Sequence, residues 1–328
     1  MRAPEFWARR TPLAHALAPL GFAYGLGARW RRTLVQPRSV AVPVICVGNL
    51  TVGGAGKTPT ALALAALLRG LGARPHYLTR GYGGRLAGPV QVDPEVHTAA
   101  DVGDEPLLLA ADAPCWVSRD RVAGAEAAVA AGAQAIVMDD GLQNPRLRKT
   151  LSMVVIDGAS GFGNGFVLPA GPLREFVTDG MARVQALVLV GPVSPATERV
   201  VARTAGNRPV LAAEFVVDAR ELAGQRVLPF AGIARPEKFF ASLAALGCEV
   251  VATAAFADHH PYREEEIAAL RRQAAGLGAA LATTSKDHVR LPAPMRAGIA
   301  RVDGRLVFDR PQAASDLLAA ALPAHTGQ

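Results

Sequence analysis

The stretch VGNLTVGGAGKTPT, residues 47–60, decides the fold. An apolar, β-branched run ends in Gly48, and residues 58–72 have the alanine and leucine content of a buried helix that glycine closes. A glycine-rich turn between a strand and a helix is the context that a phosphate-binding loop requires. We therefore expect an α/β fold with a P-loop NTPase-type parallel sheet and helices on both faces.

The loop offers a group for each part of a bound nucleoside triphosphate. Glycine lets backbone N–H groups turn toward phosphate oxygens, Lys57 supplies a cation near the β and γ phosphates, and the Thr58 hydroxyl can ligate magnesium. The residues expected to bind the nucleotide are Gly53, Gly54, Ala55, Gly56, Lys57 and Thr58.

The loop departs at two positions from the phosphate-binding loops of known NTPase subfamilies. The full pattern has glycine where this chain has Thr51, and the MinD and ParA type ATPases have a signature lysine where this chain has Val52. An accidental glycine-rich turn is the alternative, but one of only four lysines in the chain falls at position 57. We therefore expect a nucleotide-binding loop of another subfamily.

Two acidic segments are candidates for magnesium binding and proton transfer. Asp139 and Asp140 end the apolar run of residues 134–140, as in a Walker B strand, although a turn that favours aspartate has the same residues. Asp104 and Glu105 precede an apolar helix, where acids often cap the helix instead. Transfer to an alcohol needs a base for the hydroxyl proton, which favours a catalytic role for this second segment.

The segment ADHHPY, residues 257–262, offers a histidine for proton handling. Neighbouring histidines rarely point at one ligand, so a metal site is disfavoured and one histidine facing the cleft is expected. These residues alone do not distinguish His259 from His260.

Positive charge is concentrated at the N-terminus. The chain has a net charge of +7, and residues 1–38, with seven arginines and one acid, account for +6 of it, which leaves +1 for the rest. Eighteen uncharged residues, 11–28, lie between arginines and tryptophans, a pattern typical of a helix in the membrane interface. A signal peptide and a helix packed on the protein's own core are the alternatives.

The three cysteines are far apart and lack CxxC spacing, so neither a disulfide framework nor a zinc site is indicated, and a reducing compartment fits. Strands that alternate with helices predict a P-loop domain over residues 39–210 and a smaller α/β domain over 211–328. Between strands, residues 161–176 form a glycine- and proline-rich loop, in which Arg174 is the expected anion-binding residue.

Taken together, these motifs resemble the tetraacyldisaccharide 4'-kinases, the lipid A 4'-kinases of Gram-negative bacteria. The resemblance covers nearly the whole chain, through VGNLTVGGAGKTP, LTRGYGG, DVGDEPLLL, DDGLQ, FGNGFVLPAGPLRE, ADHHPY and TTSKDH. It implies transfer of the γ-phosphoryl group of ATP, with Mg²⁺, to the 4'-hydroxyl of a tetraacyldisaccharide 1-phosphate, which gives the lipid A precursor lipid IVA.

The resemblance also implies roles for residues. Asp104 would be the base, assisted by His259, so that the two domains must close to bring them together. ATP and magnesium would be held by Lys57, Thr58, Glu105, Asp139 and Asp140. The lipid would be faced by Arg80, Tyr82, Arg174 and the N-terminal helix, at the cytoplasmic face of the bacterial inner membrane.

Two other functions are considered. A MinD- or ParA-like switch ATPase on the membrane needs the lysine that Val52 replaces and has no use for the His259 segment. A nucleic-acid-dependent NTPase is suggested only by the basic composition, and the clustering of charge in residues 1–38 with few aromatic residues argues against a nucleic acid partner.

Overall fold

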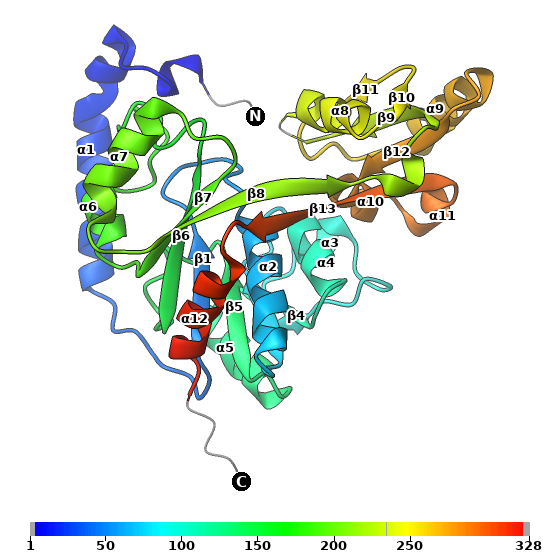
Figure 1. Ribbon diagram of the computed structural model, residues 1–328. Coiled ribbons are helices and arrows are strands. Elements are labelled where there is room, and N and C mark those ends of the chain that lie inside the picture. Colours follow the sequence, from blue (N-terminus) through cyan, green and yellow to red (C-terminus); the bar gives the residue numbers. More distant parts are fainter. Residues whose placement is uncertain (1–3, 234, 324–328) are drawn as a thin grey trace.

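A mostly parallel sheet runs through both lobes of the computed structural model, which describes residues 4–233 and 235–323 (Figure 1). Its strand order is β10-β9-β12-β13-β8-β7-β6-β1-β5-β2-β4-β3, with β11 paired to β9. Among the described strands, only β13 with β8 and β3 with β4 pair antiparallel. The predicted α/β fold class is confirmed, because parallel strands are covered by helices on both faces.

The larger lobe is a sheet between two helical layers. Its strands are β1 (Val44–Gly48), β2 (Pro75–Thr79), β3 (Val90–Gln91), β4 (Cys115–Val117), β5 (Ala135–Asp139), β6 (Leu151–Asp157), β7 (Ala186–Val190) and β8 (Val210–Asp218). One face packs on α2 (Lys57–Gly70), α4 (Asp104–Ala110) and α12 (Pro311–Ala321). The other packs on α5 (Arg121–Ala130), α6 (Val177–Met181) and α7 (Pro195–Ala205). The short helix α3 (Ala99–Val102) directly precedes α4.

The smaller lobe repeats this layering. Strands β9 (Arg226–Ala231) and β12 (Ala280–Thr284) lie between α8 (Pro236–Ala245) and α9 (Glu264–Gly276), followed by α10 (Ser285–Arg290) and α11 (Ala293–Arg296). The apolar sequence EVVATAAF, residues 249–256, predicts one strand, but the structure has two, β10 (Glu249–Val250) and β11 (Ala254–Ala255). Their register on β9 differs by one residue around Pro229, which has no N–H to donate to a ladder.

Two long antiparallel strands connect the lobes (Figure 1). Strand β13 (Ile299–Phe308) pairs with β8 from Asp303 opposite Asp218 to Phe308 opposite Ala213. After β13 the chain returns to the larger lobe, where α12 packs against α2 and contributes to the core of the larger sheet. The predicted boundary between two domains at residue 210 stays a prediction. Residues 1–3, 234 and 324–328 of the predicted segments lie outside the described residues.

The N-terminal segment contains a short 3₁₀ turn (Glu5–Trp7) and the 22-residue helix α1 (Pro12–Thr33), which lies beside α6 and α7 (Figure 1). Small residues allow close docking, since a Cβ on Gly21 would lie 2.5 Å from the Val167 carbonyl oxygen. An ion pair of 2.9 Å between Arg32 and the buried Glu175 fixes the end of the helix.

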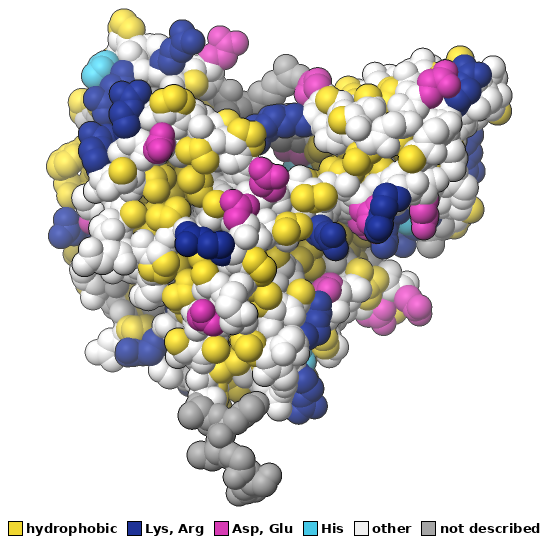
Figure 2. Space-filling view, viewed as in Figure 1, with side chains coloured by type: hydrophobic (Ala, Val, Ile, Leu, Met, Phe, Trp, Pro, Cys, Tyr) yellow, Lys and Arg dark blue, Asp and Glu magenta, His cyan; other side chains and the backbone are white. Residues whose placement is uncertain are grey.

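The opposite side of α1 exposes large apolar residues, namely Leu13, Leu20, Phe22, Tyr24, Leu26 and Trp30. On the lobe that includes α1, arginine and apolar side chains are interspersed at the surface (Figure 2). Within residues 4–233 and 235–323, no helix has the length and apolarity needed to cross a membrane. The helix therefore has one face on the protein and one apolar face in solvent.

Candidate active site

The glycine loop joins the carboxyl end of β1 to α2. Gly53 and Gly56 have φ values of 112° and 90°, which residues with a Cβ rarely adopt, and Gly56 is the residue that precedes α2. A Cβ on Gly53 or Gly54 would meet no atom within 4 Å, so this side of the loop is open. The buried Asn49 stabilises the loop, because its Nδ2 donates to the Gly53 carbonyl oxygen at 3.2 Å.

Thr58 and Asp139 face each other at the edge of the sheet. The Thr58 hydroxyl donates to Asp139 Oδ2 at 2.8 Å, while Asp139 Oδ1 is buried without a hydrogen-bond partner among the described residues. Burial above all, with the nearby Asp140 and Glu105 charges, raises the pKa of Asp139 to about 7 against the opposing effect of Lys57 and Thr58. A buried carboxylate oxygen without a partner fits a cation.

Asp140 adopts a left-handed backbone, with φ of 51°, which turns its carboxylate toward two cations. Arg174 Nη1 donates to both of its oxygens at 3.0 and 3.1 Å, and Lys57 Nζ lies 3.9 Å away. The loop of residues 161–176 holds Arg174 there, because the Arg174 backbone N–H donates to the Leu50 carbonyl oxygen at 2.7 Å. Arg174, expected to bind an anionic substrate, is thus paired with Asp140 at the phosphate loop.

A second group of charges forms where the two lobes meet. Asp104 begins α4 in the larger lobe, and its Oδ2 lies 3.0 Å from Nδ1 of His259 and 2.5 Å from Nη2 of Arg290, both from the smaller lobe. Burial acts to raise the pKa of Asp104, but the hydrogen bond from His259 and the charges of Lys286 and Arg290 outweigh it and hold the pKa below its usual range. Asp104 is therefore a buried, ionised carboxylate.

The two neighbouring histidines point in different directions. His259 has a left-handed backbone with φ of 61°, and its N–H donates to the Gly232 carbonyl oxygen, which turns the ring toward Asp104. His260 Nε2 instead pairs with Glu266 at 2.9 Å, and its ring stacks on Phe256 with centroids 4.8 Å apart. Only His259 faces the interface between the lobes.

Glu105 lies between the two groups of charges. Its Oε1 is 3.3 Å from Lys286 Nζ, and its negative charge is one of those that raise the pKa of Asp139. Among residues 4–233 and 235–323, no three histidine, cysteine or acidic side chains form a ready metal cage. Mg²⁺ usually takes one or two carboxylates together with phosphate oxygens and water, so Thr58 and Asp139 fit a magnesium site that the nucleotide would complete.

Arg80 and Tyr82 occupy the loop after β2, at the same edge of the sheet. Tyr82 is 76% exposed, and its backbone packs on Gly103 just before α4, where a Cβ on Gly103 would lie 2.5 Å from the Tyr82 carbonyl oxygen. Burial, followed by the charge of Arg80, lowers the pKa of the neighbouring Arg121 to about 10. Tyr82 therefore lies beside the start of α4 and Arg80 lies near Arg121, and neither forms an ion pair with the acidic residues of the two groups within the described part of the chain.

Several residues of the site were not predicted from the sequence. Arg290 and Lys286 contact Asp104 or Glu105 from α10, and Asn49 and the buried Arg121 lie near the phosphate loop. Lys286 had a detectable signal, because the chain has only four lysines. Arg121 and Arg290 had none, because arginine is abundant and Asp104, the partner of Arg290 in the other lobe, is 186 residues away in the chain.

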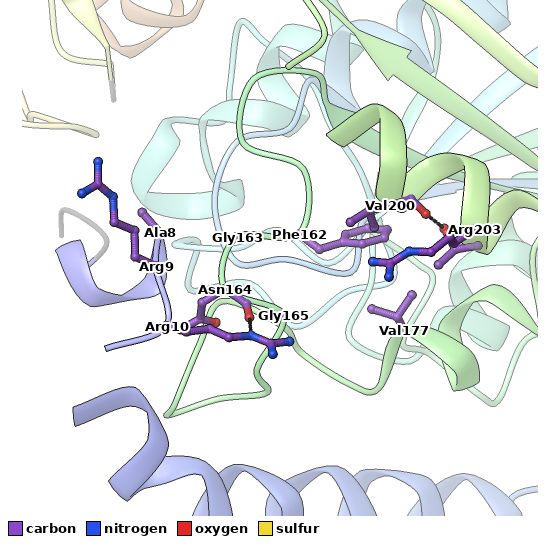
Figure 3. Close-up of a pocket in the computed structure, with 11 residues that line it drawn as sticks. Ala8, Arg9, Arg10, Phe162, Gly163, Asn164, Gly165, Val177, Val200 and Arg203 are labelled. Atoms are coloured by element: carbon purple, nitrogen blue, oxygen red, sulfur yellow. Dashed lines mark hydrogen bonds between the residues drawn. The ribbon is translucent and has the colours of Figure 1, made fainter. Parts of the chain in front are cut away.

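A separate surface hollow of about 390 Å³ lies between the N-terminal segment and α7 (Figure 3). Apolar side chains of Phe162, Val177 and Val200 line it together with Arg10 and Arg203. Arg10 is held in place, because its Nε donates to the Asn164 carbonyl oxygen at 3.2 Å and its guanidinium lies over the Phe166 ring. This hollow does not include the charged groups described above.

Comparisons with known proteins agree along almost the whole chain. Residues 13–322 match the family model described as Tetraacyldisaccharide-1-P 4'-kinase. The chain is 52% identical to the tetraacyldisaccharide 4'-kinase of Rhodospirillum rubrum over 321 residues, 97% of each protein, and 52% identical to that of Methylobacterium sp. (strain 4-46) over 333 residues, 100% of each. It superposes on the "apo" form of LpxK from Aquifex aeolicus in complex with ATP, with a TM-score of 0.76, 26% identity and coverage of 95% of this chain and 100% of that one.

Proposed function

The chain belongs to the tetraacyldisaccharide-1-P 4'-kinase family, and we propose that its phosphoryl transfer is catalysed where the two lobes meet, with Asp104 as the base and His259 as its partner. As a member of that family it is an ATP-using kinase of lipid A biosynthesis that phosphorylates the 4'-hydroxyl of a tetraacyldisaccharide 1-phosphate. The family assignment removes the alternative of a MinD- or ParA-like switch ATPase.

The observation that supports this proposal is the 3.0 Å contact between Asp104 and His259. Asp104 is ionised and able to accept a proton from the acceptor hydroxyl as the oxygen attacks phosphorus. General-base catalysis of this kind contributes about 10²–10⁴-fold to the rate. Because the two residues come from different lobes, the base is complete only when the lobes are docked, and docking excludes water that would otherwise hydrolyse ATP.

For the nucleotide, we assign phosphate binding to the loop of residues 53–58, with Lys57 near the β and γ phosphates. Thr58 and Asp139 are proposed to hold Mg²⁺, which neutralises charge on the phosphates when bound, and the buried Asp139 Oδ1 supports this assignment. Glu105 and Asp140 would complete the acidic surroundings of the ion. Arg174 keeps Asp140 in place through two hydrogen bonds.

The lipid substrate has a phosphate and a sugar backbone, and we propose that Arg80, Tyr82 and Arg174 face it. Arg80 and Tyr82 are exposed on the loop packed beside α4, so they can reach an acceptor placed near Asp104. Arg174 would meet the substrate only by sharing its guanidinium with Asp140.

The N-terminal segment, residues 1–38, is proposed to bind the cytoplasmic face of the bacterial inner membrane. The exposed apolar side of α1 and the surrounding arginines are the features that support this, since aromatic rings suit headgroup depth and arginines are attracted to anionic lipid. We keep the accompanying division into a P-loop domain, 39–210, and a smaller domain, 211–328, as part of the proposal.

The test is transfer of labelled γ-phosphate from ATP to tetraacyldisaccharide 1-phosphate in detergent micelles, with and without magnesium, by the wild type and by His259→Ala. We expect labelled lipid only with magnesium, and a loss of at least tenfold in kcat for the variant. Wild-type turnover by His259→Ala would refute the role of His259, and transfer in chelator would refute the magnesium assignment.

A further inference from the structure

Arg290 connects the two lobes through hydrogen bonds on both edges of its guanidinium, and nothing in the sequence motifs gives it a role. Its side chain is 5% exposed and lies at the end of α10, which packs against α4. One edge of the guanidinium faces the larger lobe, where Nε and Nη2 donate to Asp104 Oδ2 at 2.8 and 2.5 Å. The other edge faces its own lobe.

On that second edge Arg290 is itself held rigidly. Its Nη1 donates to the Gly232 carbonyl oxygen and to Asp287 Oδ1, both at 2.7 Å. Asp287 is fully buried, and its Oδ1 also accepts from the Tyr262 hydroxyl at 2.9 Å and the Gly232 N–H at 3.0 Å. The Gly232 carbonyl oxygen also accepts from the His259 N–H, so Arg290 and His259 are oriented by the same backbone group.

Every hydrogen bond and ion pair that the described residues make with the Asp104 carboxylate falls on one of its oxygens. Oδ2 receives Arg290 twice, His259 at 3.0 Å and the Lys286 ammonium at 3.8 Å. Oδ1 accepts no hydrogen bond from any residue in 4–233 or 235–323, and it is not among the buried side-chain atoms that lack a partner. Oδ1 is therefore the carboxylate oxygen to which the described residues donate no hydrogen bond.

We propose that Arg290 is a positioning residue, which anchors Asp104 through Oδ2 so that Oδ1 faces the acceptor and takes its proton. In the reaction the hydroxyl O–H bond breaks as the oxygen bonds to the γ-phosphorus, and the proton passes to Oδ1. The bond from phosphorus to the bridging oxygen breaks, and its electron pair leaves with ADP. This inference rests on the proposed role of Asp104, and it adds that the anchor comes from the lobe opposite the base.

The chemistry of the anchor explains why arginine occupies this position. A guanidinium presents donors in a fixed plane, so it can bind Asp104 on one edge and Gly232 and Asp287 on the other at the same time. A lysine at this position would keep the charge but lose the fixed geometry. Positioning and charge can therefore be separated by comparing Arg290→Ala with Arg290→Lys.

The experiment measures kcat and KM for Arg290→Ala, Arg290→Lys, Asp104→Ala and the double variant Asp104→Ala/Arg290→Ala, with long incubations to quantify residual transfer. We expect Arg290→Ala to lower kcat about 10–100-fold with the KM for ATP within about twofold, and Arg290→Lys to recover less than about a tenth of the loss. In the Asp104→Ala background the same change should cost less than about twofold, because the two residues act as one unit.

Arg296→Ala is the matched control for a structural effect. Arg296 belongs to the same lobe, but within the described part of the chain its side chain donates only to the backbone oxygens of Leu291 and Val289. It should keep wild-type kcat, and its melting temperature gives the cost of removing an arginine from this segment. If Arg290→Ala does not fold, Arg290→Lys is compared with Arg296→Lys by the same criteria.

The possible results distinguish the positioning role of Arg290 from the base role of Asp104. Three results would each overturn the positioning role only. The first is that Arg290→Ala lowers kcat as much in the Asp104→Ala background as in the wild type, and the second is that Arg290→Lys has wild-type kcat. The third is that Arg290→Ala keeps wild-type kcat while Asp104→Ala is inactive. Wild-type transfer by Asp104→Ala removes the proposed base itself, and the inference with it.

Discussion

Removing the exposed apolar side chains of α1 is the perturbation that most directly tests whether this kinase binds the membrane through α1. Leu20, Phe22 and Trp30 are 60%, 58% and 67% exposed. Full burial of such a side chain is worth about 1.5–3 kcal/mol, so burying the exposed part contributes about 1.5 kcal/mol each. With insertion between half and complete, the triple serine variant should lose about 2–4.5 kcal/mol of membrane affinity.

That loss corresponds to about a 30- to 1,600-fold lower partition coefficient, because each 1.4 kcal/mol is tenfold. Sedimentation with vesicles that contain anionic lipid measures it directly. In parallel, transfer to a lipid presented in vesicles should fall through a higher apparent KM, whereas transfer in dilute detergent should change less than about threefold, since the three side chains do not contact the charged groups of the site.

The control is a variant in which three apolar residues outside α1 are replaced by serine. These residues are Val96, Val193 and Leu246, whose side chains are 40–70% exposed. It removes a similar type of surface and should leave partitioning unchanged. A partition coefficient that falls less than about threefold for the α1 variant, or equally for both variants, would refute the idea that the exposed face of α1 enters the bilayer.

Three further predictions concern the site and the docking of α1. Asp104→Asn should lower kcat at least about 100-fold in the labelled-phosphate assay with ATP affinity nearly unchanged, because an amide cannot accept the proton, and near-normal transfer would contradict the assignment. Because the pKa of Asp139 is raised to about 7, the folded protein binds more protons than the unfolded chain between about pH 4 and 7, so stability falls as the pH rises through this range. The magnesium-free melting temperature should therefore decline less between about pH 5.5 and 7.5 in Asp139→Asn than in the wild type, and identical slopes would exclude Asp139 as the titrating group. Gly21→Ala should lower the melting temperature, because its Cβ would lie 2.5 Å from Val167, whereas Gly27→Ala on the same helix, with no atom within 4 Å, should raise it slightly, and equal shifts would refute close docking.

The elements that sequence patterns predicted best depend on short-range chemistry. The phosphate loop lies within residues 53–58, between a strand and a helix that have strong periodicity and end signals of their own, and the structure has β1 and α2 within two residues of the expected bounds. The expected strand over 249–256 failed because its pairing depends on Pro229 in another strand, which the local pattern does not contain.

The helix α1 shows a different limit of pattern reasoning. Its apolar run favoured either a membrane helix or a helix packed on the protein, and the structure has features of both. Gly21 and Gly25 allow contact with the larger lobe, while Leu20, next to Gly21 in the chain, is 60% exposed to solvent. Helical geometry places neighbouring residues on different faces, so a run that is apolar throughout can serve two surfaces at once.

The proposed base, Asp104, depends least on residues near it in the sequence. Asp104 was recognisable as an acid before a helix, but its orientation depends on His259 and Arg290, which reach it only because β8 and β13 hold the second lobe against α4. No spacing rule links positions 104 and 290, and because arginine is abundant in the chain, Arg290 does not stand out in the sequence. The topology therefore makes Arg290, a residue of α10 outside the phosphate loop, the partner of the proposed base, which is why we propose that it positions Asp104 for proton transfer.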